Sequence, residues 1–125
     1  MSEIKKEYLI KANIEKVFKA LTDPIEIEYW SGAPAIMESL IGGKFSLWGG
    51  SILGINVLIE ENKIVQDWKE STWQDYSNVM FELENMGHKT LLKLEHSNIP
   101  VSSVNDIDNG WDDHYLNPLK SYLEQ

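Results

Sequence analysis

Residues 104–125 read VNDIDNGWDDHYLNPLKSYLEQ, and this stretch decides how the rest of the chain can fold. Its apolar side chains recur at every third or fourth position, namely Val104, Ile107, Trp111, Tyr115, Leu119, Tyr122 and Leu123. This spacing places them on one face of a helix with a 3.6-residue period. An aromatic-rich helix face needs a partner surface, and we expect the preceding segments to supply a sheet.

The segments before this helix have the short apolar runs and tight turns of an antiparallel sheet. Strand patterns occur at residues 3–11, 33–40, 44–48, 52–60, 63–70, 78–84 and 89–97. The connections after residue 33 are too short for parallel crossovers, so we expect an antiparallel meander. Gly42-Gly43 predicts a hairpin turn in which both glycines have positive φ.

Two short helices are expected between the first two strands. Asn13 is a suitable N-cap for a helix that ends at Thr22-Asp23, and Pro24 is well placed as the first residue of the next helix. The order of elements predicts an α+β helix-grip fold in a single domain, residues 1–125. A curved antiparallel sheet of about six strands would wrap around the long C-terminal helix.

Composition excludes several classes of partner. The chain carries 20 acidic and 11 basic residues, a net charge of −9, and all 11 basic residues are lysine. The negative net charge and the absence of arginine argue against binding to nucleic acid or to an anionic membrane surface. No apolar run is long enough to insert into a membrane. The absence of cysteine and of a signal-peptide pattern favours a cytoplasmic location.

Several motifs, in this order, resemble a known superfamily. They are KANIEKVFKALTDP at residues 11–24, GGKFSLWGG at 42–50, IVQDW at 64–68, TLLKLEH at 90–96, and Gly110-Trp111 in the last helix. Together they resemble the START-like (SRPBCC) superfamily, and more narrowly the C-terminal domain of activators of the heat-shock-protein-90 ATPase. The resemblance implies the helix-grip fold and a possible chaperone partner in the stress response. The full-length co-chaperone also has a separate N-terminal domain, for which 125 residues leave no room.

The aromatic residues suggest a cavity between sheet and helix. The side chains expected to line it are Trp30, Gln66, Trp68, Phe81, His96, Trp111 and Tyr115. The same rings could equally be ordinary core, and His96 could be a buried histidine with a satisfied hydrogen bond. A metal site formed by His96, Asp112 and His114 lacks a recognisable ligand spacing, and Asp112-Asp113 is better explained by the positive end of a helix dipole.

Three functions remain open at this point. The favoured one is a non-enzymatic START-like domain that binds a hydrophobic or amphipathic small molecule in this cavity. The second is a co-chaperone-like interaction module, and the third is a cyclase- or hydrolase-like enzyme with His96 as general base. No catalytic motif or cofactor is predicted. Pro118 should either kink the last helix or restart it after Asn117, and the loop residues Trp73 and Tyr76 mark either an oligomer interface or a rim.

Overall fold

A computed structural model describes residues 2–125 of the chain. The strands are β1 (Ser2–Ile10), β2 (Ile36–Met37), β3 (Lys44–Leu47), β4 (Ile52–Glu60), β5 (Lys63–Glu70), β6 (Ser77–Met86) and β7 (Lys89–Ile99). The α-helices are α1 (Ile14–Thr22), α2 (Pro24–Ser31), α3 (Val104–Gly110) and α4 (Asn117–Leu123). Single 3-10 turns at Trp48–Gly50 and Val101–Ser103 complete the secondary structure with a π-helical turn at Trp111–Leu116. No helix in this part of the chain is long and apolar enough to cross a membrane.

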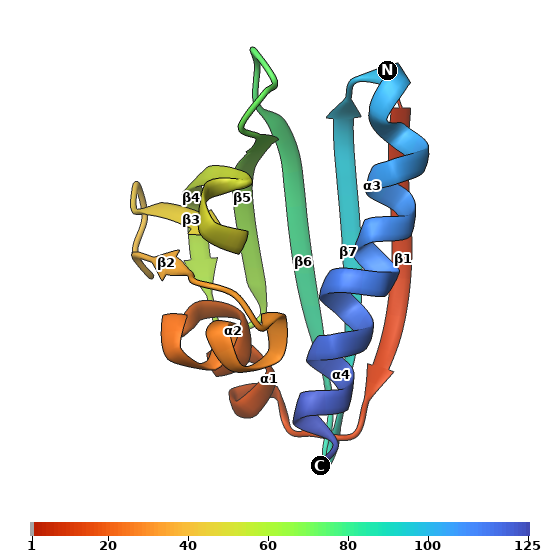
Figure 1. Ribbon diagram of the computed structural model, residues 1–125. Helices are drawn as coiled ribbons and strands as arrows, with labels where there is room; N and C mark the ends of the chain where they lie inside the picture. Colours follow the sequence, from red (N-terminus) through yellow and green to blue (C-terminus); the bar gives the residue numbers. More distant parts are fainter. Residues whose placement is uncertain (1) are drawn as a thin grey trace.

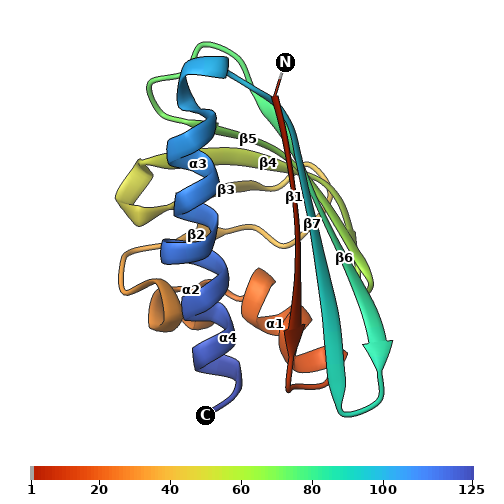
Figure 2. The same ribbon diagram turned by 90° about the vertical axis from the view of Figure 1, so that its right-hand side faces the viewer.

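The strands form one antiparallel sheet in the order β1-β7-β6-β5-β4-β3-β2. The sheet is curved, and α3 and α4 lie across its concave face (Figures 1 and 2). The predicted helix-grip fold is therefore confirmed, with seven strands where about six were expected. The predicted strand at residues 33–40 is reduced to the two residues of β2.

The loop between β2 and β3 explains why β2 is so short. Instead of a two-residue hairpin, residues 38–43 form a loop, and only Gly42 of its two glycines has positive φ, so the prediction for Gly43 is wrong. A side chain at Gly43 would collide with the backbone of Glu38, because an added Cβ would lie 2.2 Å from that carbonyl oxygen. Gly43 is thus needed for close packing, whereas Gly42 is needed for its backbone angle.

Strict alternation along the strands fills the concave side of the sheet. On β6, Val79, Phe81 and Leu83 are buried, and on β7 Leu92 and Leu94 are buried. The inner faces of the strands and the apolar faces of the helices form one core cluster. Burial of these apolar side chains is the main term that stabilises the fold, at about 25 cal/mol per Å² removed from water.

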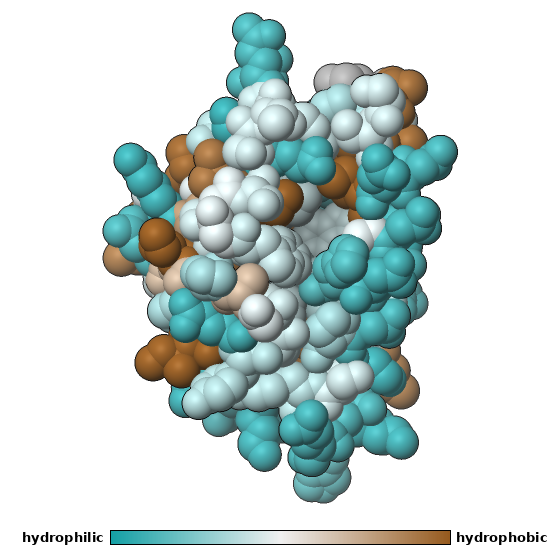
Figure 3. All heavy atoms as spheres, viewed as in Figure 1, coloured by the Kyte–Doolittle hydropathy of each residue, from teal (hydrophilic) through white to brown (hydrophobic). Residues whose placement is uncertain are grey.

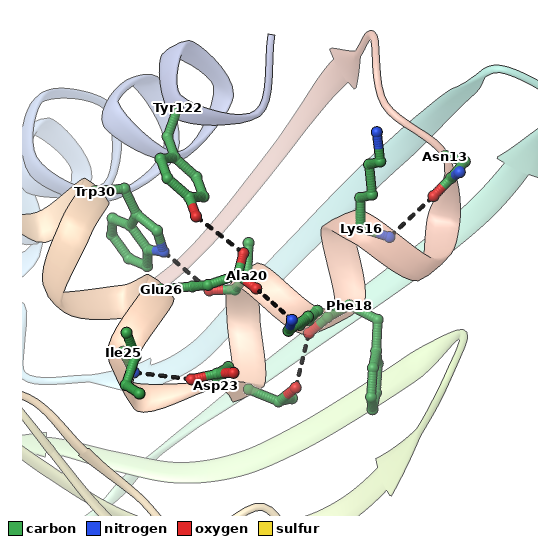
Figure 4. Close-up of polar contacts among 11 residues, drawn as sticks. Asn13, Lys16, Phe18, Ala20, Asp23, Ile25, Glu26, Trp30 and Tyr122 are labelled. Atoms are coloured by element: carbon green, nitrogen blue, oxygen red, sulfur yellow. Dashed lines mark hydrogen bonds and ion pairs between the residues drawn. The ribbon is translucent and has the colours of Figure 1, made fainter. Parts of the chain in front are cut away.

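Both short helices are capped, the first by Asn13 as predicted and the second by Asp23, and Figure 4 shows their contacts. The side chain of Asn13 accepts a hydrogen bond from the Lys16 amide at 3.0 Å, and that of Asp23 accepts one from the Ile25 amide at 2.8 Å. Pro24 is the first residue of α2. These caps satisfy amides that have no partner inside their helices.

Side-chain hydrogen bonds join this helical corner to its neighbours. The indole nitrogen of Trp30 donates to the Ala20 carbonyl at 2.9 Å, which locks α2 onto α1. The Tyr122 hydroxyl donates to Glu26 at 3.1 Å and its ring stacks on Tyr29, so the end of α4 is fixed against α2.

The closing helix runs from Val104 to Leu123 without interruption, although Pro118 lies within it. Asn117 has helical dihedral angles, so it is not a cap and the helix does not restart there. The π-helical turn that precedes Pro118 instead bonds the Asn117 amide to the Asp112 carbonyl. A change in hydrogen-bond register therefore accommodates the amide that proline lacks, which neither predicted alternative included.

Strand β1 anchors the middle of the closing helix. Lys6 Nζ lies 2.9 Å from Asp112 and 2.8 Å from Asp108, and the Tyr8 hydroxyl donates to Asp112 at 2.6 Å. The predicted role of Asp112 at the positive end of a helix dipole is wrong, because this residue lies in mid-helix and pairs with β1. Burial and the Asp112 carboxylate raise the pKa of the Tyr8 hydroxyl, so the tyrosine acts as a neutral donor.

A substitution at Gly54 in β4 tests how tightly this strand packs against its neighbours. A Cβ at Gly54 would lie 2.0 Å from the Phe45 ring and 2.3 Å from the Asp67 carbonyl oxygen. We expect Gly54→Ala to lower the free energy of unfolding by about 2–3 kcal/mol, because neither neighbour can retreat cheaply. Urea unfolding followed by tryptophan fluorescence measures the change.

A matched control for this test is Gly110→Ala, since an added Cβ at this helical position meets no atom within 4 Å. Alanine should raise stability there by about 0.5–1 kcal/mol through helix propensity. Equal effects of the two substitutions would contradict the packing assigned to Gly54.

Candidate functional site

An open cavity of about 360 Å³ lies between the closing helix and the end of the sheet where β4 begins and β5 ends. Figure 3 shows the surface hollowed between α3 and the turn before β4. Its lining residues are Trp48, Ser51, Ile52, Trp68, Glu70, Asp106, Ile107, Gly110, Trp111, His114 and Tyr115. This volume is within the range of small-molecule sites.

Four aromatic rings form the walls of the cavity. Trp68 and Trp111 stack with their centroids 5.6 Å apart, and Tyr115 lies 4.7 Å from Trp111. Trp48 meets the edge of Tyr115 at 6.1 Å. Because these rings support one another, the cavity has a preformed apolar lining.

The predicted site residues are divided between the cavity and the core behind it. Trp68, Trp111 and Tyr115 line the cavity, whereas Trp30, Gln66, Phe81 and His96 are buried and do not line it. The loop residue Trp73 is half-buried, with its ring centroid 5.9 Å from that of Trp68.

His96 is the centre of a buried hydrogen-bond relay. The indole N–H of Trp111 donates to His96 Nδ1 at 2.9 Å, so this nitrogen carries no proton. The other nitrogen, Nε2, must then hold the proton and donate it to Ser77 Oγ at 2.7 Å. Ser77 in turn donates to the Trp68 carbonyl at 2.5 Å. The relay fixes the histidine in one neutral tautomer.

This environment removes His96 from acid–base chemistry. The side chain is fully buried, and burial lowers its pKa to about 3. A proton on Nδ1 would also face the N–H of Trp111, donor against donor. Both nitrogens are occupied, so His96 offers neither a base to a substrate nor a ligand to a metal ion. Within residues 2–125, no three potential metal ligands come together.

Gln66 belongs to a second buried polar pair. Its side-chain amide donates to Asn56 Oδ1 at 3.0 Å, and the side-chain amide of Asn56 donates to the Glu38 carbonyl at 2.8 Å. The pair holds the loop before β3 onto β4 and β5. Gln66 is therefore satisfied inside the protein and has a structural role in this geometry.

Sequence reasoning missed eight of the lining residues, and two of them, Trp48 and Glu70, show why. Trp48 has φ of 51° and begins a 3-10 turn, so its direction could not be read from a strand pattern. Glu70, in contrast, follows Gln66 and Trp68 at alternate positions, and that pattern already assigns it to the inner face. The alternation was a usable signal for Glu70.

The neutral His96 predicts how stability depends on pH. The imidazole binds a proton in the unfolded chain below its ordinary pKa of about 6.5 but not in the folded chain above about pH 3. The free energy of unfolding should therefore fall by about 2 kcal/mol from about pH 7 to about pH 5. Urea unfolding at several pH values measures this loss.

The control for the pH experiment is His88→Gln, at an exposed turn position that leaves the relay intact. It should retain the loss of stability, whereas His96→Asn should flatten it. An unchanged pH dependence in the His96 variant would contradict the assigned protonation state.

Comparison with known proteins identifies relatives of the whole fold. The family described as "Activator of Hsp90 ATPase homolog 1-like protein" matches residues 11–124. The crystal structure of an HSP90 activator from Plasmodium falciparum superposes with a TM-score of 0.93 at 32% identity, covering 98% of this chain and 96% of that one.

Two curated relatives are named as activators of the 90 kDa heat shock protein ATPase. "Activator of 90 kDa heat shock protein ATPase homolog 2" of Mus musculus is 26% identical over 93% of this chain and 36% of its own length. Homolog 1 of Homo sapiens is 25% identical over 85% of this chain and 32% of its own length. The chain thus spans about a third of the length of these curated relatives. On the family match over residues 11–124, the chain belongs to the family of activator of Hsp90 ATPase homolog 1-like proteins.

Proposed function

We propose that the protein is a co-chaperone-like module that binds the 90 kDa heat shock protein and acts on its ATPase in the cytoplasm, as part of a stress response. The supporting observation is the end-to-end similarity to the HSP90 activator of Plasmodium falciparum. The mouse and human relatives named as ATPase activators support the same function. This function requires a surface for the chaperone and no catalytic group.

One exposed apolar surface suits this purpose. It consists of Ile36, Leu40 and Ile41, which are 60%, 62% and 65% exposed, and we call it the loop patch. Figure 3 has apolar side chains at the edge of the molecule where β2 and the following loop lie. Large exposed apolar groups close together are typical of protein-binding surfaces.

The loop patch is held in a fixed shape before any partner binds. The Gly42 amide donates to the Asn56 carbonyl at 2.7 Å, and the Asn56 amide donates to the Gly43 carbonyl at 2.8 Å. The side chain of Asn56 also holds the Glu38 carbonyl. Little conformational entropy is then lost on docking, which favours affinity.

The chaperone function is tested with the double variant Leu40→Ser/Ile41→Ser. We expect the wild-type chain to bind the 90 kDa heat shock protein of its own host and to raise its ATPase rate. The double variant should bind at least about tenfold more weakly, because the loss falls on the centre of the interface. Calorimetry and a coupled ATPase assay measure the two quantities.

Val101→Ser is the matched control, because Val101 is 70% exposed and lies in the connection from β7 to α3, which is at the top of the molecule in Figure 1, away from β2 and its loop. It should bind like the wild type. No binding by the wild-type chain would exclude the proposed function, and equal loss in both variants would exclude the loop patch as its surface.

A second candidate function is the binding of a hydrophobic or amphipathic small molecule, and the aromatic cavity favours it. Its aromatic rings support one another, and its volume of about 360 Å³ is within the range of small-molecule sites, as expected for a preformed pocket.

Gly110→Leu tests the ligand function separately from the chaperone function. Gly110 lines the cavity and has free space around an added Cβ, so a leucine side chain can occupy the space without disturbing the core. Native mass spectrometry of protein purified from its own host should show a bound small molecule on the wild type and none on the variant. Chaperone binding should be unchanged. A wild-type mass without any adduct would contradict the ligand function.

A further inference from the structure

We propose that the cavity is selective for a small organic cation, an ammonium group carried on an apolar or aromatic body. The proposal rests on the ligand function described above and adds the chemical class of the ligand. It follows from the placement of two carboxylates beside the aromatic walls.

Glu70 is a carboxylate on the inner face of the sheet. It follows Trp68 at the alternate position of β5 and pairs in register with Ile52 of β4, and all three residues line the cavity. Its side chain takes part in no ion pair within residues 2–125, because every ion pair there is formed by another carboxylate. The side chain is half-buried at an open cavity, so its carboxylate is available to a cation that enters.

Asp106 supplies a second carboxylate from the facing wall. It lies on α3, four residues before Gly110, and it also lines the cavity without an ion-pair partner among residues 2–125. No lysine lines the cavity, although the chain has 11. The net charge of −9 adds to the negative potential at this opening.

The aromatic walls complement the same charge. Trp48, Trp68, Trp111 and Tyr115 line the space, and the face of an aromatic ring attracts cations through its electrostatic quadrupole. Quaternary ammonium groups are bound in this way because they are weakly hydrated and apolar at their surface. The walls accept the apolar body, while Glu70 and Asp106 favour the positive end.

The same arrangement disfavours an anionic amphiphile. A fatty-acid or phosphate head group would face two carboxylates, and neither a lysine nor an arginine is available among the lining residues to offset them. Like charges at such a site cost affinity through repulsion and desolvation. Charge therefore decides between two ligand classes that the apolar walls alone would accept equally.

The experiment compares two probes of similar shape and opposite charge, benzyltrimethylammonium and phenylmethanesulfonate. Binding to the wild-type protein is followed by tryptophan fluorescence and by the upfield ring-current shift of the benzylic CH2 protons, which both probes carry. We expect the cation to bind with a Kd below about 1 mM and the sulfonate to bind at least about tenfold more weakly.

The double variant Glu70→Gln/Asp106→Asn keeps the shape of the cavity and removes its charge. It should weaken cation binding by about three- to tenfold and narrow the difference between the two probes. Raising the salt concentration to about 0.5 M should weaken binding of the cation to the wild type but hardly change binding to the variant. Unfolding curves check that both proteins are equally folded.

Four results would overturn the proposal. Equal affinity of both probes, or an unchanged affinity of the double variant for the cation, would exclude charge selectivity while leaving the ligand function in place. Binding of neither probe up to about 10 mM would exclude a ligand cavity altogether. Tighter binding of a short lysine peptide than of the small cation would assign the cavity to a side chain of a partner protein.

Discussion

The hydrogen bond from Trp111 to His96 joins the closing helix to the middle of the sheet, and the arrangement of the site depends on it. Both groups are buried, so a misplaced helix would leave a polar atom without a partner, at a cost of about 1–3 kcal/mol. The relay continues through Ser77 to the backbone of Trp68, and it thereby ties β7, β6 and β5 to the helix. This polar chain fixes which turn of the helix faces which strand, a choice that apolar packing alone leaves loose.

The cavity is a consequence of where the helix is anchored. Lys6 and Tyr8 hold the middle of the closing helix. Two hydrogen bonds hold its C-terminal end, one from Lys120 to the Leu9 carbonyl and one from the Lys11 amide to Glu124. The helical corner of α1 and α2 fills the space under that end (Figure 2). Near α3, the wall opposite the helix is a 3-10 turn that consists of Trp48 and two glycines, and its one ring does not fill the space completely.

The sequence was sufficient for the fold because each strand face follows from alternation. It placed Trp68 and His96 on the inner side, and both are buried. It could not divide the inward residues between cavity and core, because that division depends on the position of the helix along the sheet. The π-helical turn shifts this position, and no simple periodicity announces such a turn. The short length of β2 could not be predicted from the residue pattern either. The loop that replaces the expected strand is held by contacts of Asn56, which is distant in the sequence.

The two candidate surfaces are physically connected, yet we expect them to act independently. Asn56 holds the loop patch through the Glu38 carbonyl, and it accepts from Gln66, two residues before Trp68 in the cavity wall. A chain of contacts alone does not transmit a signal, because coupling requires an element with two arrangements that both sites bias. The side-chain amides of Asn56 and Gln66 are paired in one geometry, and a competing arrangement would break one of these hydrogen bonds. Changes at the loop patch and in the cavity should therefore have additive effects, as expected for sites that share no switching element.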